Sequence, residues 1–561
     1  MCPGSAIIVR APPAPGLLSG ALKFEVTAEM SRSIAVLALA LLVGPTAGAQ
    51  EPYVAPSPAP SQAGNDPRPV LELTLDDAVR RTLENNVDIA VERFNPEASV
   101  LNIDQLRGFY EPVLNSEVTS NSAARPSSNA FSGAQNINTD TWNYNFGASQ
   151  NVPTGGSLSL DLTNRRTSTN SVFESFNPSF SSNFNLRYSQ PFLRNFRTDS
   201  RRTQIKVAKN NREISDFTFR QTVVNTVASV KQSYYDLLYA IDNLEAQRKS
   251  LALAAKFLEE NQIKVRVGTM APLDVVQAES EQASREEAVI VAEAAVAEAE
   301  DALKRAIFNT NDPATWETRI VPVERPTAEP FSVDLQAAIQ TALGKRTDMA
   351  AARKRLDSAE YNVVYARNQL LPTLDLVAAY GTNGIGGTFI ERDGLGGPVI
   401  RTVPGGFGDA IGDVFGRNFP TWTLGFNVAY PIFNRTADAA AARAQISRDQ
   451  SQATIRRLEM QITGEVRSAA RAVETNYKRV ESTRAARVLQ ERRLDAETKK
   501  FAAGMSTNFL VTQSQRDLAV AEVAELRAIA DYRKSLVNFE RVQESGLGGG
   551  GGTVTVSTGG N

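Results

Sequence analysis

Two copies of one arrangement follow each other along the chain, and this internal duplication constrains the fold more than any other feature. The segment LTLDDAVRRTLENNVDIAVER, which begins at Leu73, is echoed by VDLQAAIQTALGKRTDMAAAR, which begins at Val333. At the same sequence offset, Pro112 in the first copy is matched by Pro372 in the second. A repeat of this kind indicates two similar structural units that bury their apolar faces together.

The duplication sets the expected domain boundaries. We predict a first repeat over residues 70–312 and a second over 331–545, joined by a linker at 313–330. A Pro-rich linker at 50–69 precedes the first repeat, and the Gly-rich residues 546–561 form a flexible tail.

The N-terminal residues have the pattern of a secretory leader. Ile34 to Val43 is an apolar run, and the following residues up to Gln50 contain the small residues of an A-x-A cleavage site. We therefore expect residues 1–49 to be a signal peptide, with Met30 as the true start of translation. The sole cysteine, Cys2, would be lost with it, so the mature protein would be exported and would carry neither a disulfide nor a lipid anchor.

Composition excludes several function classes. The 561 residues are 42% hydrophobic and 22% charged, with a formal net charge of -2, so no excess of positive charge points to nucleic acid. The absence of histidine removes His general bases, Ser-His-Asp triads and His-containing zinc sites. Carboxylates or lysine could still serve an enzyme, although the commonest catalytic residues are missing, and we single out no catalytic, cofactor or metal site.

Six short segments alternate apolar and polar residues, as strands with one apolar face do. They are Val113–Thr119, Trp142–Asn151, Ser157–Thr163 and Asn183–Tyr188 in the first repeat, and Leu374–Tyr380 and Trp422–Tyr430 in the second. No segment is apolar for the eighteen or so residues that a spanning helix needs, so strands would have to enter any membrane. Strands of a soluble sandwich alternate in the same way. The Gly-rich stretch from Gly381 to Gly416 is expected to be an extracellular loop between two strands.

Long stretches without helix breakers predict long helices. Phe192 to Val267 contains neither Gly nor Pro, and Ile432 to Ala503 contains only Gly464, so each suffices for a helix of roughly 100 Å. Each run ends at a turn and is followed by a returning helix, over Leu273–Asp312 and Met505–Ser545. Apolar residues recur every seven positions at Val223, Val230, Leu237, Leu244, Leu251 and Leu258. This spacing fits either a coiled-coil seam in a closed ring or an ordinary antiparallel bundle.

In this order of leader, helix, strands, long helix, VGTMAPLDVVQAE turn and returning helix, repeated to FAAGMSTNFLVTQSQRD, the chain resembles the TolC-type outer-membrane efflux family over roughly residues 70 to 545. The resemblance implies an α+β membrane protein: a homotrimer whose strands close one outer-membrane β-barrel, continued by a periplasmic α-helical barrel. With six strands per chain, the trimer would have eighteen. The family is not enzymatic, so the resemblance implies that this chain is not an enzyme; the family passes small molecules or secreted protein outward, driven by an inner-membrane pump through a periplasmic adaptor. The alternative is an exported coiled-coil structural or adhesive protein without a pore.

The resemblance also implies that the two turns are periplasmic tips, which meet the adaptor and narrow the tunnel. The residues carried over are Val267, Gly268, Thr269, Leu273 and Asp274 in the first tip, and Gly504, Met505, Phe509, Leu510 and Gln513 in the second. Some relatives carry two aspartates in the second tip, where this chain has Leu510 and Gln513. Asp274 is retained in the first tip, although an acid there also suits the N-terminal turn of a helix.

Overall fold

The computed structural model describes residues 69–127, 134–309, 313–325, 327–394 and 397–544, which belong to the unit Pro67–Asn561. The predicted signal peptide, almost all of the Pro-rich linker and the Gly-rich tail lie outside the described residues. Among the helices described, none combines the length and hydropathy that a bilayer-spanning helix requires.

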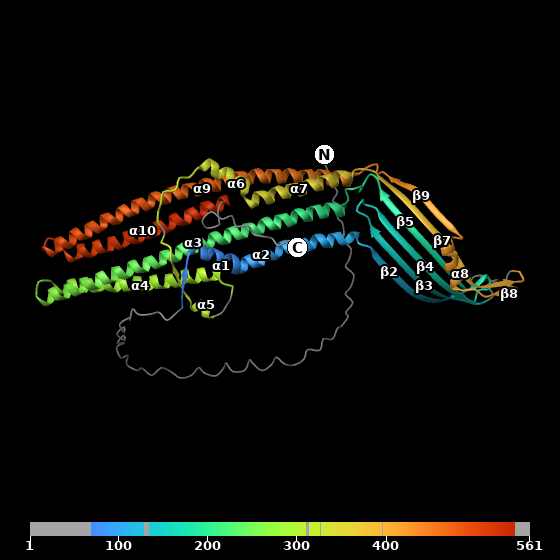
Figure 1. Ribbon diagram of the computed structural model, residues 1–561, viewed down its shortest axis with the longest axis horizontal. Coiled ribbons are helices and arrows are strands. Elements are labelled where there is room, and N and C mark those ends of the chain that lie inside the picture. Colours follow the sequence, from blue (N-terminus) through green and yellow to red (C-terminus); the bar gives the residue numbers. More distant parts are fainter. Residues whose placement is uncertain (1–68, 128–133, 310–312, 326, 395–396, 545–561) are drawn as a thin grey trace, which may run out of the picture. The chain divides into compact units, whose positions relative to one another are not determined.

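Each repeat places two short helices before its strands and two long helices after them (Figure 1). The first comprises β1 (Val70–Leu73), α1 (Leu75–Asn85), α2 (Val87–Arg107), the 3-10 turn η1 (Gly108–Tyr110), β2 (Val113–Pro126), β3 (Asn136–Asn151), β4 (Ser157–Thr169), β5 (Phe176–Pro191), α3 (Ser200–Arg266) and α4 (Pro272–Ile307). The connection contains α5 (Pro313–Glu317) and β6 (Arg319–Pro322). The second comprises α6 (Leu335–Lys345), α7 (Thr347–Asn368), β7 (Thr373–Arg392), β8 (Val399–Val403), α8 (Phe407–Gly416), β9 (Pro420–Ala429), α9 (Arg435–Ala502) and α10 (Asn508–Gln543).

The predicted long helices are α3 and α9, of 67 and 68 residues, and each packs against the helix that returns from its tip. Helix α3 starts where Asp199 accepts a hydrogen bond from the backbone N–H of Arg202, a side-chain cap of the first turn. The heptad residues Val223, Val230 and Leu237 are buried, whereas Leu244, Leu251 and Leu258 of the same seam are only half-buried. The seam therefore packs tightly far from the tip and loosely near it.

The six predicted strands are present, and a short seventh strand, β8, is added to them. Their order is β2-β3-β4-β5-β7, and β7 is long enough to pair with β9 along its first half and with β8 at its end. The expectation of a loop over Gly381–Gly416 was wrong, because the stretch contains the end of β7, all of β8 and the helix α8. Glycine lacks the side chains that produce an alternating pattern, so the sequence did not reveal this part of β7.

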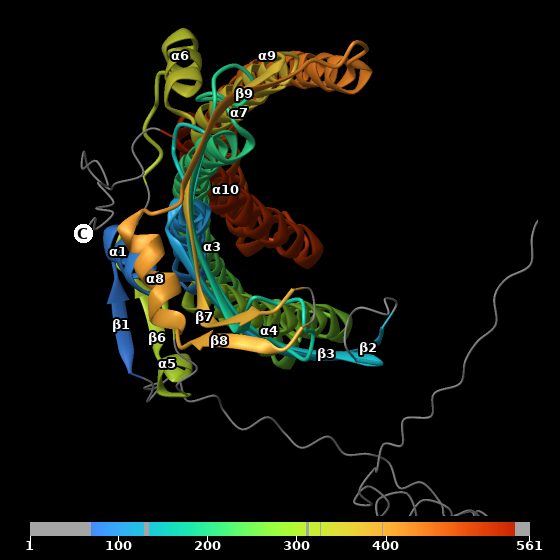
Figure 2. The same cartoon turned by 90° about the vertical axis from the view of Figure 1, so that its right-hand side faces the viewer.

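The register of the strands gives the sheet one apolar face. Directly opposed residues share a face, and one such row runs across six strands as Leu114, Ala148, Leu160, Leu186, Tyr380 and Trp422. The positions between these rows are mostly polar, as in Glu117 opposite Asn145 and Asn183 opposite Asn383. Figure 2 shows that the sheet is curved, with α8 against its convex side. The apolar face is the one that α8 covers in part, so it is the convex face.

Two clusters of buried hydrophobic residues pack the long helices against short neighbouring elements. One surrounds Tyr234 and Leu237 of α3 and includes Leu73 and Ile320 of the two paired strands β1 and β6. The Tyr234 hydroxyl donates to the Leu73 carbonyl oxygen over 3.2 Å, and burial raises the pKa of Tyr234 to about 12. The other cluster surrounds Ile462, Val466 and Tyr532 and repeats the arrangement in the second half.

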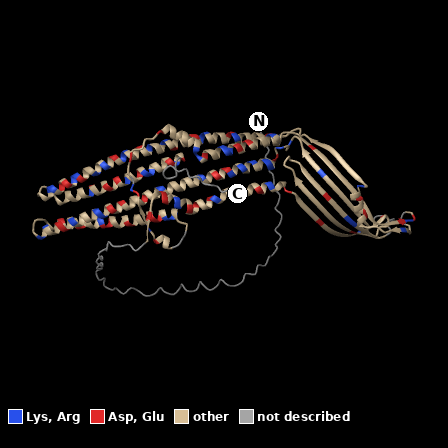
Figure 3. Ribbon diagram, viewed as in Figure 1, with Lys and Arg blue, Asp and Glu red and all other residues tan. Residues whose placement is uncertain are grey.

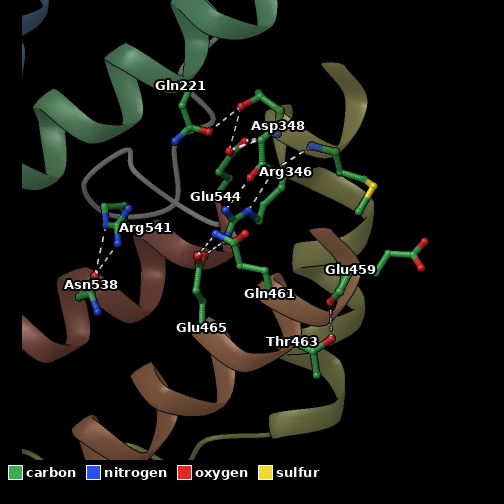
Figure 4. A network of polar contacts seen from close by, with 12 residues as sticks. Gln221, Arg346, Asp348, Glu459, Gln461, Thr463, Glu465, Asn538, Arg541 and Glu544 are labelled. Atoms are coloured by element: carbon green, nitrogen blue, oxygen red, sulfur yellow. Dashed lines mark hydrogen bonds and ion pairs between the residues drawn. The ribbon is translucent and has the colours of Figure 1, made fainter. Parts of the chain in front are cut away.

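A polar network joins the start of α7 to α3, α9 and α10 (Figure 4). The Glu544 carboxylate accepts hydrogen bonds from the backbone N–H of Thr347 at 3.1 and 3.0 Å, and the Thr347 hydroxyl contacts Gln221 at 2.9 Å. Arg346 lies between Asp348 and Glu465, with an N–O distance of 2.6 Å to each carboxylate. Arg346 and Thr347 thus connect the start of α7 to α3, α9 and α10.

Replacing Arg346 with leucine is expected to destabilise this junction by about 1–2 kcal/mol at neutral pH, since partly exposed pairs contribute less than buried ones. Burial raises the pKa of Glu465, but hydrogen bonds from Gln461 and Arg346 outweigh it and hold that pKa below its ordinary value. Stabilisation from a depressed carboxyl pKa is present above the ordinary pKa and is lost as pH falls through the folded-state pKa. Thermal unfolding followed by circular dichroism should show a lower midpoint for Arg346→Leu at pH 7, and a smaller difference at pH 3.

The matched control is Arg353→Leu, since Arg353 is exposed on the same helix. An equal loss of stability in both variants, or a difference that is the same at both pH values, would contradict the role given to the Arg346 pairs.

Candidate functional site

The first tip closes with a backbone motif typical of helix ends. The N–H of Gly268 donates to the Val265 carbonyl oxygen over 3.0 Å, and the N–H of Thr269 donates to that of Lys264 over 2.9 Å. These two bonds define a Schellman motif, which requires a left-handed residue at the helix end. Gly268 supplies it with a φ of +79°, a conformation that glycine adopts without steric cost.

The second tip repeats this geometry. Gly504 has a φ of +75°, its N–H donates to the Phe501 carbonyl oxygen over 3.1 Å, and the N–H of Met505 donates to that of Lys500 over 2.9 Å. The returning helices begin differently, since α4 has Pro272 at its start and α10 has Asn508 there. The internal duplication therefore extends to the hydrogen bonds of the turns but not to the first residue after them.

The tip residues predicted from the sequence are mostly exposed. Val267, Leu273, Met505, Phe509 and Leu510 are 41% to 77% exposed, so each turn presents apolar side chains to its surroundings. The other described segments cover these side chains only in part, and Leu510 the most, which leaves the exposed part available to a second molecule. Apolar side chains grouped in this way mark contact sites between proteins.

Of the three predicted polar residues of the tips, Thr269 is exposed, whereas Asp274 and Gln513 are less accessible. Asp274 is half-buried in the first turn of α4, where a carboxylate is stabilised by the helix dipole. Gln513 is also half-buried, and its side-chain amide donates to Asp517 one turn along α10 over 2.8 Å. Neither position therefore presents a free carboxylate at the end of the hairpins.

A buried asparagine joins the two hairpins behind the tips. Asn508 is 4% exposed; its amide donates to the Asp274 carbonyl oxygen over 3.0 Å and its oxygen accepts from the Asn261 amide over 3.0 Å. One side chain of α10 therefore bonds to both helices of the first hairpin. Phe501 adds aromatic contacts, with its ring centroid 5.9 Å from that of Phe257 and 4.2 Å from the Lys264 ammonium nitrogen.

A buried carboxylate forms a second connection farther from the turns. Glu281 of α4 is 3% exposed and lies between two arginines. Arg285 of the same helix donates to one carboxylate oxygen over 2.8 Å, and Arg516 of α10 donates to the other over 2.6 Å. A carboxylate held this far from water needs such partners, so the pair resists separation of α4 from α10.

The sequence did not single out Asn508, Glu281 or Arg516. Asn508 stands where the first copy has Pro272, and a difference between the two repeats at this position was the only available signal. Among the described residues, no group of His, Cys, Asp and Glu could hold a metal ion. The site is thus two apolar turns, held together by polar contacts between the hairpins that carry them.

Comparison with known proteins assigns the fold. The family described as "Outer membrane efflux protein" matches residues 157–307 and 338–542. Solved structures of similar fold include CusC, with a TM-score of 0.62 and 15% identity, covering 88% of this chain and 99% of that one. The outer membrane channel CmeC of Campylobacter jejuni has a TM-score of 0.58 and 18% identity, covering 84% and 86%. VceC of Vibrio cholerae has a TM-score of 0.59 and 15% identity, covering 84% and 96%. No curated protein matches the chain by sequence.

Proposed function

The chain belongs to the outer membrane efflux protein family, and on this basis we propose that it is the outer-membrane channel of a tripartite efflux or secretion system. It resides in the outer membrane, with its helical part in the periplasm. As a channel it would carry small molecules or secreted protein outward and would not act as an enzyme. Charged residues are frequent along the helices, which is compatible with an aqueous environment (Figure 3). They are scarce on the strands, which is compatible with a lipid environment.

The observation that carries this proposal is a sheet with one apolar face and two open edges. Strand β2 pairs only with β3 and strand β9 only with β7, so each leaves its other side unpaired among the described strands. Lipid does not tolerate unpaired backbone groups, so a sheet in the membrane must close. We propose that β2 of one copy pairs with β9 of the next and that three copies form a barrel of eighteen long strands.

The lengths of the connections between strands fit the proposed orientation of the sheet, with its helix-bearing end in the periplasm. At the end of the sheet nearest the long helices, β3 and β4 are joined by a tight turn in which the N–H of Val152 donates to the Gly156 carbonyl oxygen over 2.8 Å. The connections at the far end are longer, above all the one from β7 to β9, which contains β8 and α8. Outer-membrane barrels have short periplasmic turns and long extracellular loops.

The tips would then be the docking end of the channel. We propose that the exposed apolar residues of both turns bind a periplasmic adaptor, which connects the channel to an inner-membrane pump. The proposed contacts are made by Val267, Gly268, Thr269, Leu273, Gly504, Met505, Phe509 and Leu510, with Asp274 and Gln513 positioned beside them.

A conductance measurement tests the channel. Purified protein added to a planar lipid bilayer should produce discrete current steps, whereas an exported coiled-coil protein without a pore would produce none. Since the tips narrow the proposed tunnel, the native protein is measured beside Arg516→Ala, which removes a contact between the hairpins. Absence of steps for both proteins, each verified as a trimer by native mass spectrometry, would contradict the channel.

A further inference from the structure

Helix α8 lies on the apolar face of the sheet (Figure 2), against β5 and β7 near the end far from the long helices (Figure 1). The β7 residues that lie against α8, Gly384 and Gly386, belong to this face. Gly384 stands opposite Ser182 and Gly386 opposite Phe180, in the rows that follow Thr382 opposite Phe184. The Phe407 ring of α8 lies 6.2 Å from the Phe180 ring, measured between centroids.

Two glycines allow the helix to approach the strand backbone directly. A Cβ atom on Gly384 would lie 2.0 Å from the Ala410 carbonyl oxygen, and one on Gly386 would lie 2.3 Å from the Gly406 carbonyl oxygen. Any other residue would therefore displace α8 from β7. The helix occupies the part of the apolar face where β7 has Gly384 and Gly386 and so supplies no side chains.

The polar side chains of α8 point toward the strand or the helix ends. The Asp409 carboxylate accepts the Gly406 N–H over 2.8 Å at the start of the helix, and the Asp413 carboxylate accepts the Asn418 amide over 2.7 Å beyond its end. Their Cβ atoms are the ones that approach the Cβ positions of Gly386 and Gly384, at 3.1 and 2.9 Å. Neither acid lies on the side away from the sheet.

The side of α8 that carries neither acid is apolar, and it runs from Phe407, which contacts Phe180 of the sheet, to Phe415, which stands clear of it. Phe407, Ile411 and Phe415 follow one another at intervals of four residues and so form one stripe along the helix. Phe415 is 73% exposed and Phe407 45%, while Ala410 and Val414 are buried against the sheet. A helix that is apolar on its inner and outer sides is typical of an apolar surrounding, since a water-exposed helix carries polar residues on its outer side.

We propose that the stripe Phe407–Ile411–Phe415 is a lipid-contact surface, seated in the acyl chains of the outer leaflet where it continues the apolar face of the barrel. This inference rests on the proposed function, because it requires the sheet to lie in the membrane. A neighbouring copy of the chain is the less suitable occupant. The edges proposed for pairing are β2 and β9, whereas α8 lies over β5 and β7, against the part of β7 that extends past the end of β9 and pairs there with β5.

Spin-label accessibility tests the assignment. In a Cys2→Ser background, single cysteines replace Phe415, Leu424 on the apolar face of β9, or Ser284 on the exposed side of α4. Each nitroxide-labelled protein is reconstituted in vesicles of phosphatidylethanolamine and phosphatidylglycerol, and its collisions with oxygen and with a water-soluble nickel chelate are compared. Positions 415 and 424 should favour oxygen, whereas position 284 should favour nickel.

The outcomes separate the inference from the channel proposal. A label at 415 that behaves like 284, with 424 in lipid, would overturn the lipid contact and leave the embedded sheet intact. A label at 415 shielded from both reagents would show protein contact instead, which also overturns it. Aqueous behaviour at both 415 and 424 would contradict the embedded sheet itself, and with it the proposed function.

A second variant tests whether the lipid contact depends on the close packing of α8 on β7, and it leaves the stripe itself unchanged. Gly384→Val in the protein labelled at 415 should displace α8 and reduce the preference for oxygen over nickel at least severalfold, while the label at 424 keeps its preference. Gly425→Val on β9 is the matched control, because nothing lies within 4 Å of a Cβ placed there. If Gly384→Val leaves the preference for oxygen at position 415 unchanged, the lipid contact does not depend on the packing of α8 against Gly384.

Discussion

The double substitution Gly268→Val with Gly504→Val should abolish export while the protein still reaches the outer membrane and assembles. Both glycines have a positive φ, and an L-residue in the left-handed region costs roughly 1–2 kcal/mol, more when it is β-branched. Nothing lies within 4 Å of a Cβ placed on either glycine, so the whole effect comes from the backbone of the turns. The apolar tip residues that follow each glycine would be displaced, and the adaptor would lose its binding surface.

Susceptibility of the complemented deletion strain to exported toxic compounds measures this result, together with the amount of trimer in outer-membrane fractions. Gly464→Val is the control, because Gly464 lies inside α9 without a positive φ and without a neighbour within 4 Å of its Cβ position. Unchanged export by the double variant would remove the tips from docking. Loss of the trimer would make the turns purely structural.

Local patterns explain why the two hairpins could be predicted. A left-handed residue at a helix end is met by glycine, so Gly268 and Gly504 marked both turns, and the absence of Gly and Pro marked the helices between. The strands were found where side chains alternate, but β7 continues to Arg392, beyond its last predicted residue, Tyr380. Its far half contains Gly384 and Gly386, which serve the contact with α8 and carry no alternating pattern.

The connections between the hairpins could not be predicted, because no local pattern records them. Asn261 and Asn508 are 247 positions apart in the sequence and become neighbours only after both hairpins have formed. Glu281 and Arg516 are ordinary residues of a charged helix surface in the sequence, and only the fold buries the carboxylate. The predicted tip residues were those that the turns expose, whereas the residues that hold the turns together were missed.

Replacing Arg516 with alanine is expected to increase the ratio of open to closed channels about tenfold, which corresponds to about 1.4 kcal/mol. Removing one partner of a buried ion pair destabilises the structure by about 3–5 kcal/mol, but Arg285 still neutralises Glu281 and Arg516 is half exposed, which reduces the effect. The substitution removes the ion pair between α4 and α10, so it favours any state in which the two hairpins move apart. If the closed tunnel depends on this contact, the open state becomes more populated.

Single-channel recording in planar bilayers gives both the conductance and the open fraction. Arg527→Ala is the matched control on α10, because Arg527 is 62% exposed and its ion pair, to Asp531 at 4.0 Å, lies within its own helix. Arg516→Lys should fall between the native protein and Arg516→Ala, since lysine keeps the charge but not the two-pronged geometry of the guanidinium. An equal open fraction in Arg516→Ala and the native protein would mean that the tunnel is held closed elsewhere. In that case the Asn508 bonds to Asp274 and Asn261 are the remaining described polar link between the hairpins at the tips, and Asn508→Ala would be the variant to open it.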